Sequence, residues 1–253
     1  MSSPGSPTEP RRIAMWSGPR NLSTALMRAF EARGDCAVTD EPLYAVYLQA
    51  TGLEHPAREA VLASQSSDWS VVAAELTGAV PGGRPLWYQK HMAHHLLPHV
   101  GRDWLDGLTH AFLLREPASM LASLARVWPN PTLEDTGLPQ QLELYRRLRE
   151  AGRTPPVIDS DDLLEDPAGQ LRVLCDALEI PATDAMLTWQ AGPRASDGVW
   201  APHWYASVER STGFGPPREA ADPGALPEHV LPLLEPARAI HAELHAERLI
   251  PSA

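Results

Sequence analysis

Residues 15–30 read MWSGPRNLSTALMRAF. An apolar run ends at Ser17, a short turn passes through Gly18 and Pro19, and an amphipathic helical pattern begins near Ser23. A buried strand followed by a turn and a helix is the unit from which parallel α/β sheets are built. The amides and the dipole of the helix N-terminus point at the turn, so this stretch suits the binding of an anion.

The rest of the chain repeats this alternation of strands and helices. Short apolar runs predict strands at 11–17, 36–41, 85–90, 110–115 and 155–160. Amphipathic patterns predict helices at roughly 22–34, in pieces of 42–78, and at 116–128, 166–180 and 227–248. Strands that alternate with helices pair in parallel, which predicts an α/β fold of three layers, with a central parallel sheet flanked by helices.

The composition of the chain disfavours several classes of function. The 253 residues are 43% hydrophobic and carry a formal net charge of −11, which disfavours non-specific binding to nucleic acid. No apolar run is long enough to cross a bilayer, so no membrane partner is expected. Residues 1–10 lack the apolar segment of a secretory signal and are predicted to be a disordered lead-in. Cys36 and Cys175 lie among apolar residues, which indicates core positions in a reducing, cytoplasmic setting.

Residues 11–253 show no internal repeat and no convincing linker, which predicts a single domain. Within it, residues of about 190–227 are rich in Gly, Pro and Ser and lack periodicity. A loop of this length in a compact domain is either disordered or functional. Function is favoured by its four aromatic residues, Trp200, Trp204, Tyr205 and Phe214.

The turn after the first strand is not a Walker A loop, because no Gly-Lys-Ser or Gly-Lys-Thr follows Gly18. Residues 16–24 resemble instead the 5′-phosphosulfate loop of the sulfotransferases that use 3′-phosphoadenosine 5′-phosphosulfate (PAPS). In that loop a hydroxyl residue is followed by Pro, then Lys or Arg, and then paired Ser/Thr. The matching positions here are Ser17, Pro19, Arg20, Ser23 and Thr24. Arg in place of the commoner Lys keeps the charge but gives up a proton-donating role.

Two further segments resemble the same family. Residues 110–124, HAFLLREPASMLASL, match its 3′-phosphate motif through Arg115 at a strand end, Pro117, and Ser123 on the next helix. An Arg fork binds phosphate oxygens bidentately, and a hydroxyl adds a donor. Residues 157–181 match a late strand followed by an acidic, Asp-Pro-containing turn and a helix, with Ser160 where an aromatic residue is usual.

The resemblance implies a P-loop-like form of the α/β fold, with PAPS as the sulfuryl donor and 3′-phosphoadenosine 5′-phosphate (PAP) as the product. It implies in-line transfer to a hydroxyl or amine of a small-molecule acceptor, with no metal required. It places the donor's 5′ end against Ser17, Gly18, Pro19, Arg20, Asn21, Leu22, Ser23 and Thr24, and its 3′-phosphate against Arg115 and Ser123. It also implies a lid over the site in the long loop, with nucleotide contacts at Arg210, Ser211, Thr212 and Gly213.

The resemblance gives Arg20 the role of stabilising the transferred group, and leaves two candidates for the catalytic base. Glu41 follows the second strand, where several family members place a catalytic Glu, but it needs a raised pKa. His91 follows the third strand and titrates near neutrality. We prefer Glu41. His91 also heads an i, i+4, i+8 series with His95 and His99, which Pro98 interrupts, so we expect a solvated or acceptor-facing stripe of histidines there.

Two other functions remain open at this stage. A kinase-like phosphotransferase would need a Mg²⁺-binding carboxylate beside the loop, and Asp161 and Asp162 are the fair candidates. A catalytically degenerate protein of the same fold would bind a protein partner instead. The residues at 42–80 and 190–215 suit an uncharged or amine-bearing acceptor, and the sequence leaves a homo-oligomer open.

Overall fold

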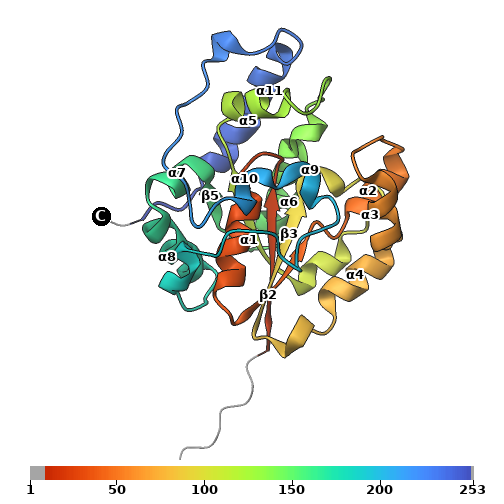
Figure 1. The fold of residues 1–253 in the computed structure, drawn as a ribbon, viewed down its shortest axis with the longest axis vertical. Coiled ribbons are helices and arrows are strands. Elements are labelled where there is room, and N and C mark those ends of the chain that lie inside the picture. The colour runs from red at the N-terminus through yellow and green to blue at the C-terminus, as the bar shows by residue number, and fades with distance from the viewer. Residues whose placement is uncertain (1–8, 252–253) are drawn as a thin grey trace, which may run out of the picture.

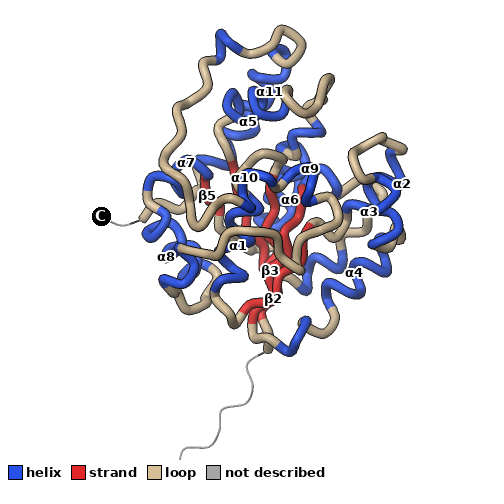
Figure 2. The backbone as a smooth tube through the Cα atoms, viewed as in Figure 1, coloured by secondary structure: helices blue, strands red, loops and turns tan. Residues whose placement is uncertain are grey.

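The five predicted strands form one sheet. The computed structural model describes residues 9–251, and all its strand pairs are parallel (Figure 1, Figure 2). The strands are β1 (Arg11–Ser17), β2 (Cys36–Asp40), β3 (Leu86–Met92), β4 (Thr109–Leu114) and β5 (Val157–Asp159). Their order across the sheet is β2-β3-β1-β4-β5, which puts β1 in the centre. The predicted α/β fold with a central parallel sheet is therefore confirmed, whereas residues 1–8 of the predicted lead-in lie outside the described part.

Alternation along β1 decides which helices cover which face. Ile13 and Met15 pack on one face, whereas Ala14 and Trp16 pack on the other. The first face is covered by α1 (Ser23–Ala32), α7 (Ser160–Glu165) and α8 (Pro167–Ala177). The second face is covered by α2 (Tyr44–Thr51), α4 (Trp69–Thr77), α6 (Leu138–Glu150) and α11 (Leu231–His245). Strands buried on both faces explain the continuous apolar runs of the sequence.

The remaining helices lie farther from the sheet. They are α3 (Arg58–Ser64), which packs on α2, α5 (Pro117–Leu124), which packs on α11, and the short α9 (Ala201–Trp204) and α10 (Ala206–Glu209). Short 3₁₀ turns occupy Pro81–Gly83, Ala93–His95, Asp103–Gly107, Glu134–Thr136, Asp184–Leu187 and Pro223–Ala225. The chain between α10 and α11 runs along the molecule to its upper end in Figure 1, where it reaches α5.

Most predicted helices are present, with shifted ends. The helical pieces expected within 42–78 are α2, α3 and α4, and the C-terminal helix begins at Leu231 instead of 227. Three regions differ from the prediction: α6, whose buried Leu144 and Leu148 follow helical spacing, was not predicted, α7 begins at Ser160 within the predicted fifth strand, and α9 and α10 lie inside the predicted loop. Those two helices are single turns, too short to leave a periodic pattern.

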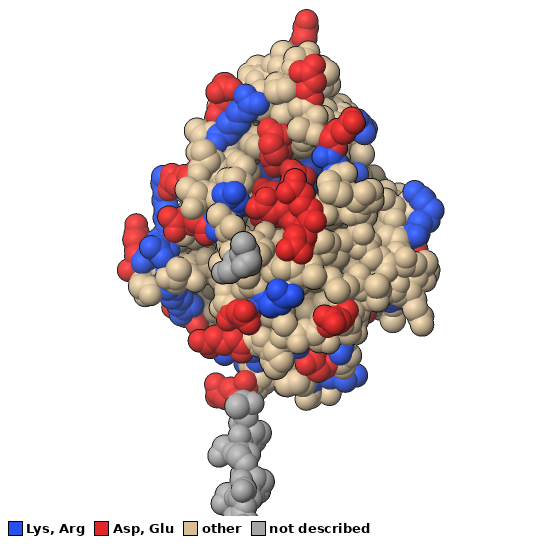
Figure 3. All heavy atoms as spheres, turned by 90° about the vertical axis from the view of Figure 1, so that its left-hand side faces the viewer, with Lys and Arg blue, Asp and Glu red and all other residues tan. Residues whose placement is uncertain are grey.

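The cysteines, the charged side chains and the helix lengths can be compared with what the composition predicted. Cys36 and Cys175 are free and buried, as predicted. Figure 3 shows the face that carries α7 and α8, where acidic side chains gather near the middle among scattered basic ones. Within residues 9–251, no helix combines the length and the apolar content that a membrane crossing requires.

Candidate active site

A cavity of about 700 Å³ opens at the carboxyl-terminal edge of the sheet. Its wall includes residues that follow β1, β2, β3 and β4 and residues of the segment after α9. Ligands of open parallel sheets bind at this edge, because strand-to-helix turns and helix N-termini meet there. Residues 19–25, which join β1 to the first turn of α1, form one end of the cavity.

The turn between β1 and α1 presents backbone amides to the cavity. Leu22 is the N-cap of α1 and makes no side-chain capping bond, so Ser23 and Thr24 stand in the first helical turn and do not cap it. Arg20 and Leu22 adopt left-handed backbone, with φ of 66° and 63°. Non-glycine residues held in this region are strained, and such strain concentrates at functional sites. The uncapped first turn is therefore open to an anion.

Gly18 is required in this turn by a close approach of the chain. A Cβ built at Gly18 would collide with the carbonyl oxygen of Thr136. The turn consequently rests directly on the segment that leads into α6, and the next residues are directed toward the cavity.

The two arginine motifs of the sequence meet beside this turn. Nε of Arg20 donates to Oγ of Ser123 at 3.0 Å, and Nη1 of Arg115 donates to the carbonyl oxygen of Arg20 at 2.7 Å. Arg115 is only 8% exposed, and its Nε has no hydrogen-bond partner among the described residues. A buried guanidinium with an unused donor has the chemistry to bind a phosphate or sulfate oxygen.

A third guanidinium, which the sequence analysis missed, joins the cluster. Arg218 lines the same cavity as Arg20 and Arg115. Burial and then the charge of Arg218 lower the pKa of Arg20 and also the pKa of Arg115. Three cations crowded into one cavity repel each other, and an anionic ligand relieves that repulsion. Arg218 follows Pro216 and Pro217 in a segment without periodicity, so no sequence pattern indicated that it belongs to the site.

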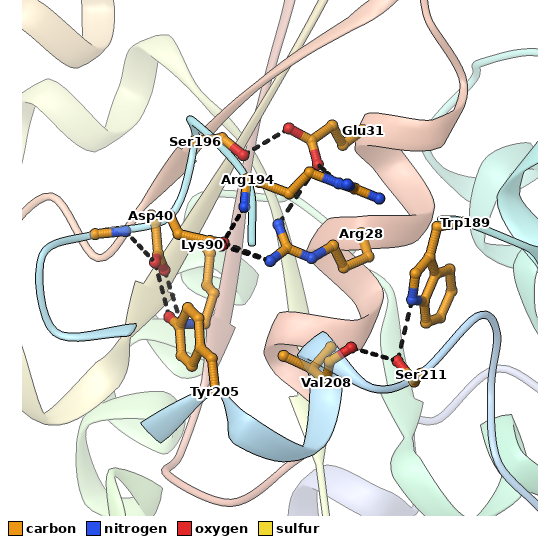
Figure 4. A network of polar contacts seen from close by, with 12 residues as sticks. Arg28, Glu31, Asp40, Lys90, Trp189, Arg194, Ser196, Tyr205, Val208 and Ser211 are labelled. Carbon is orange, nitrogen blue, oxygen red and sulfur yellow. Dashed lines mark hydrogen bonds and ion pairs between the residues drawn. The ribbon is translucent and has the colours of Figure 1, made fainter. Parts of the chain in front are cut away.

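The opposite part of the cavity contains a buried lysine between two carboxylates. Nζ of Lys90 donates to Oδ1 of Asp40 at 2.8 Å, to Oε1 of Glu41 at 2.6 Å and to the hydroxyl of Tyr205 at 2.7 Å. That hydroxyl donates to Oδ2 of Asp40 at 2.7 Å (Figure 4). All three ammonium protons of Lys90 are used, and hydrogen bonds from the described residues reach only Oε1 of Glu41, which leaves Oε2 for a ligand.

This network shifts the titration of its members. Burial raises the pKa of Glu41 above the usual value of a glutamate; Lys90 opposes the rise, and Asp40 adds to it. Burial lowers the pKa of Lys90, but Asp40 and Glu41 outweigh it, so the pKa of Lys90 stays well above its ordinary value. Glu41 also adopts left-handed backbone with φ of 40°. A carboxylate with a raised pKa facing a cavity is suited to take a proton.

His91, the competing base candidate, does not reach the cavity. β3 extends to Met92, and alternation along the strand turns His91 to the face opposite Lys90. There its ring stacks on Trp16 with 4.3 Å between centroids, and burial, with a smaller contribution from His110, lowers its pKa to about 3. His91, His95 and His99 do not form the expected stripe. His91 is buried on the other face of the sheet, His95 lines the cavity, and His99 is exposed.

Aromatic and neutral imidazole rings line the cavity beside Glu41. His95 stacks on Tyr44 and on Tyr47, with 4.7 Å between centroids in both pairs. Burial lowers the pKa of His94 to about 3 and lowers the pKa of His95 well below its ordinary value. Neighbouring histidines add to both shifts. These imidazoles are therefore neutral at pH 7. Other rings in this wall belong to His55, Trp128, Trp204 and Tyr205.

The predicted long loop is tied to the sheet and to α1 (Figure 4). The buried Arg28 of α1 pairs with Asp197 at 2.6 Å, and Glu31 accepts from Ser196 at 2.5 Å. Farther along, Trp200 Nε1 donates to the hydroxyl of Tyr205 at 3.1 Å. The segment around 190–213 is thus held in place by several buried polar contacts, and its later part forms one wall of the cavity.

The cavity brings together most of the candidate residues that the sequence analysis named. It is lined by Pro19, Arg20, Asn21, Leu22, Ser23, Thr24, Glu41, Arg115, Ser123, Ser211 and Gly213. The structure does not bring to it Ser17, Gly18, His91, Arg210 and Thr212. The carboxylates that a kinase would need, Asp161 and Asp162, do not line it either, and Asp162 is paired with Arg248 at 2.9 Å.

Comparisons with known proteins show the family to which the chain belongs. Residues 11–238 match the family model described as "Sulfotransferase domain". Two Arabidopsis thaliana proteins, named branched-chain-amino-acid aminotransferase-like proteins 1 and 2, are 42% and 38% identical over 83% and 82% of this chain. The match covers only 38% and 37% of those relatives, so this chain corresponds to less than two fifths of their length.

Solved structures show the same fold. One is the sulfotransferase domain from the curacin biosynthetic pathway, with a TM-score of 0.53 and 16% identity over 96% of this chain and 100% of that one. Another is a sulfotransferase from Alicyclobacillus acidocaldarius, with a TM-score of 0.54 and 13% identity over 96% and 98% of the two chains. With the family model matched over most of its length, the chain belongs to the sulfotransferase domain family.

Proposed function

We propose that this protein transfers a sulfuryl group from PAPS to a hydroxyl or amine of a small-molecule acceptor by in-line displacement. One observation carries the proposal. The paired arginines Arg20 and Arg115, with Ser123, meet at the uncapped N-terminus of α1 in a cavity that also contains Glu41.

The residues at one end of the cavity fit a ligand with phosphates at its 5′ and 3′ positions. The buried, unpartnered Nε of Arg115 and the hydroxyl of Ser123 are donors for the 3′-phosphate. The first-turn amides of α1, with Ser23 and Thr24, are donors for the 5′-phosphate. Arg218 adds a third positive charge. Since the net charge of the chain is −11, this local cluster, and not the overall field, must attract the ligand.

Sulfuryl transfer needs positioning and positive charge more than covalent help from the protein. Bound PAPS would supply a sulfuryl group activated by its phosphate leaving group. Arg20 stabilises the negative charge that builds on the equatorial oxygens and on the leaving oxygen, as arginine does in phosphoryl transfer. The acceptor oxygen or nitrogen forms the new bond to sulfur while the bond from sulfur to the 5′-phosphate oxygen breaks.

Glu41 is the base in this proposal. Its Oε1 is held by Lys90, and Oε2 takes the proton of the acceptor as the new bond forms. The raised pKa of Glu41 strengthens it as a base, and the charge of Lys90 opposes that rise. His91 receives no role, because it packs against Trp16 on the other face of the sheet.

The wall beside Glu41 favours an uncharged or amine-bearing acceptor with an apolar or aromatic body. Lys90 is a cation in that wall, and the two carboxylates of Asp40 and Glu41 more than offset its charge, which disfavours an anionic acceptor. The neutral rings of Tyr44, His95 and Trp128 offer flat surfaces and no net charge to bind an anionic group. The free, buried cysteines support a reducing, cytoplasmic setting for the reaction.

Calorimetric titration with PAP, ADP and ATP, each with and without Mg²⁺, tests the proposal. We expect PAP to bind tightly, ADP to bind much more weakly for lack of the 3′-phosphate, and Mg²⁺ to have no effect on PAP. A preference for ATP with Mg²⁺ would instead support a phosphotransferase. Absence of nucleotide binding would support a protein-binding role and refute the donor site.

A further inference from the structure

Two histidines and an aspartate form a cluster outside the cavity, at the edge of the sheet. Asp159 ends β5, and His241 and His245 lie one turn apart on α11. One ligand atom from each side chain lies within 4.8 Å of the other two. We propose that these three residues bind a divalent transition-metal ion, for which Zn²⁺ is the best match, and that the ion fastens α11 to the edge strand β5.

The ring of His241 is placed for such an ion and has no other partner. Its Nε2 is buried, makes no hydrogen bond to any described residue, and lies 3.5 Å from Oδ2 of Asp159. Buried polar atoms are nearly always satisfied, so an unused nitrogen facing a carboxylate needs an explanation. The ring of His245 lies 4.9 Å from that of His241 at an interplanar angle of 28°, so the two imidazoles are nearly parallel.

A backbone amide and the spacing along α11 orient the three side chains toward one point. Oδ1 of Asp159 accepts from the amide of Asp161 at 2.7 Å, which fixes the carboxylate and leaves Oδ2 toward the histidines. Such outer contacts orient metal ligands. His241 and His245 are four residues apart on α11, so the two rings lie on one face of that helix.

Arg248 competes with the ion for His245. Its Nη1 lies 3.3 Å from Nδ1 of His245, and its Nε donates to Oδ2 of Asp162 at 2.9 Å. A guanidinium only donates, so it uses the imidazole lone pair that a metal at that nitrogen would need. Asp162 retains Arg248 when the ion displaces it from the ring. The two carboxylates and one guanidinium leave one net negative charge, which attracts a dication.

The donor set selects the class of ion. Two imidazole nitrogens and one carboxylate oxygen suit Zn²⁺ and its neighbours, whereas Mg²⁺ and Ca²⁺ prefer sites made wholly of oxygen. Tetrahedral zinc holds its ligand atoms about 3.3 Å apart. The present separations therefore close by side-chain rotation, and a water molecule completes the fourth position.

A bound ion would strengthen the attachment of the short edge strand β5. β5 has only three residues, and its outer edge is covered by the chain after α11, where the amide of Leu249 donates to the carbonyl oxygen of Val157 at 2.8 Å. An ion shared by Asp159 and α11 adds a second link between the same two elements. This inference does not depend on the proposed function.

Zinc titration of tag-free, chelator-stripped protein tests the proposal, with a chromophoric chelator as competitor. We expect one equivalent to bind. His241→Asn and His245→Asn should each weaken binding by about 100-fold or more. The matched control is His229→Asn, because His229 is exposed and precedes α11; its affinity should equal that of the unaltered protein.

Two further measurements separate a metal site from a simple ion pair. Arg248→Met removes the competing cation and should tighten zinc binding by about tenfold. Zinc should raise the unfolding temperature of the unaltered protein and of the His229→Asn variant, but not that of the His241→Asn variant. Zero stoichiometry, or equal zinc affinity in the unaltered protein and the His241→Asn variant, would overturn the proposal.

Discussion

Nε of Arg20 donates a hydrogen bond to Oγ of Ser123 at 3.0 Å, although 103 positions separate the two residues in the sequence. Arg20 follows β1 and Ser123 lies on α5 after β4, and these strands are neighbours in the sheet. Arg115 joins them through the carbonyl oxygen of Arg20. Two separate sequence motifs thus form one cationic cluster.

Replacement of Arg115 by alanine should weaken PAP binding by roughly 10- to 100-fold, the loss expected for one or two charge-assisted hydrogen bonds. The unfolding free energy should change by less than about 1 kcal/mol, because Arg115 makes a single hydrogen bond to the described residues and its removal relieves repulsion from Arg218 and Arg20. Calorimetry and urea unfolding measure the two effects. Arg172→Ala is the matched control, since Arg172 is exposed, does not line the cavity and does not affect the pKa of Arg20 or Arg115. Unchanged PAP affinity in the Arg115 variant would remove the 3′-phosphate assignment.

Glu41→Gln should leave PAP binding intact and reduce turnover by about 100-fold or more, because the amide keeps the shape but cannot accept the proton. Product formation with labelled donor measures this once an acceptor is found. Glu54→Gln serves as the control, since Glu54 lines the same cavity but is exposed. Full activity of the Glu41 variant would require another base.

The pH dependence of turnover should carry the signature of Glu41. A base works only when deprotonated, so kcat should fall as the pH drops through the pKa of Glu41. Because burial raises that pKa, the fall should begin at a higher pH than an ordinary glutamate would give. A pH–rate profile of the unaltered protein and of the His91→Asn variant checks this. An acid limb that disappears in the His91 variant would contradict the assignment.

Tyr205→Phe should lower the unfolding free energy by about 1–3 kcal/mol, because Lys90, Asp40 and Trp200 all lose a buried hydrogen-bond partner. Amide hydrogen exchange at 198–213 should quicken, since this contact ties the segment to the strand ends. Tyr145→Phe is the matched control: its hydroxyl makes one longer bond of 3.3 Å to Glu247, and the loss should stay below about 1 kcal/mol. An equal loss of unfolding free energy in the two variants would contradict the stabilising role of the Tyr205 hydroxyl.

Much of the fold could be predicted because its signals are local. Each strand is a short apolar run, and the Ser17–Thr24 turn places its arginine and hydroxyls by sequence alone. The order of the strands could not be predicted, since it depends on which crossovers pack best. The hydrogen-bond network around Lys90 could not be predicted either, because Asp40 and Tyr205 are 165 positions apart and no sequence pattern links them.

His91 shows how a small error in a strand end changes a site. The apolar run suggested a strand that ends at residue 90, which would leave His91 in a loop beside the cavity. The strand continues to Met92, and its two-residue alternation sends Lys90 to the cavity side and His91 to the opposite face. Extending the alternation by two residues would have favoured Lys90 as the cavity residue.

The left-handed backbone at Arg20, Leu22 and Glu41 has a consequence for engineering. Each such residue stores on the order of 1 kcal/mol that glycine would release. At Leu22, searches for heat-resistant variants should therefore find glycine favoured. At Arg20 and Glu41 the same exchange also removes the contacts to Ser123 and to the buried Lys90, and the loss of a buried partner outweighs the strain released. The side chains that the proposed reaction uses therefore also keep the strained backbone in place at this edge of the molecule.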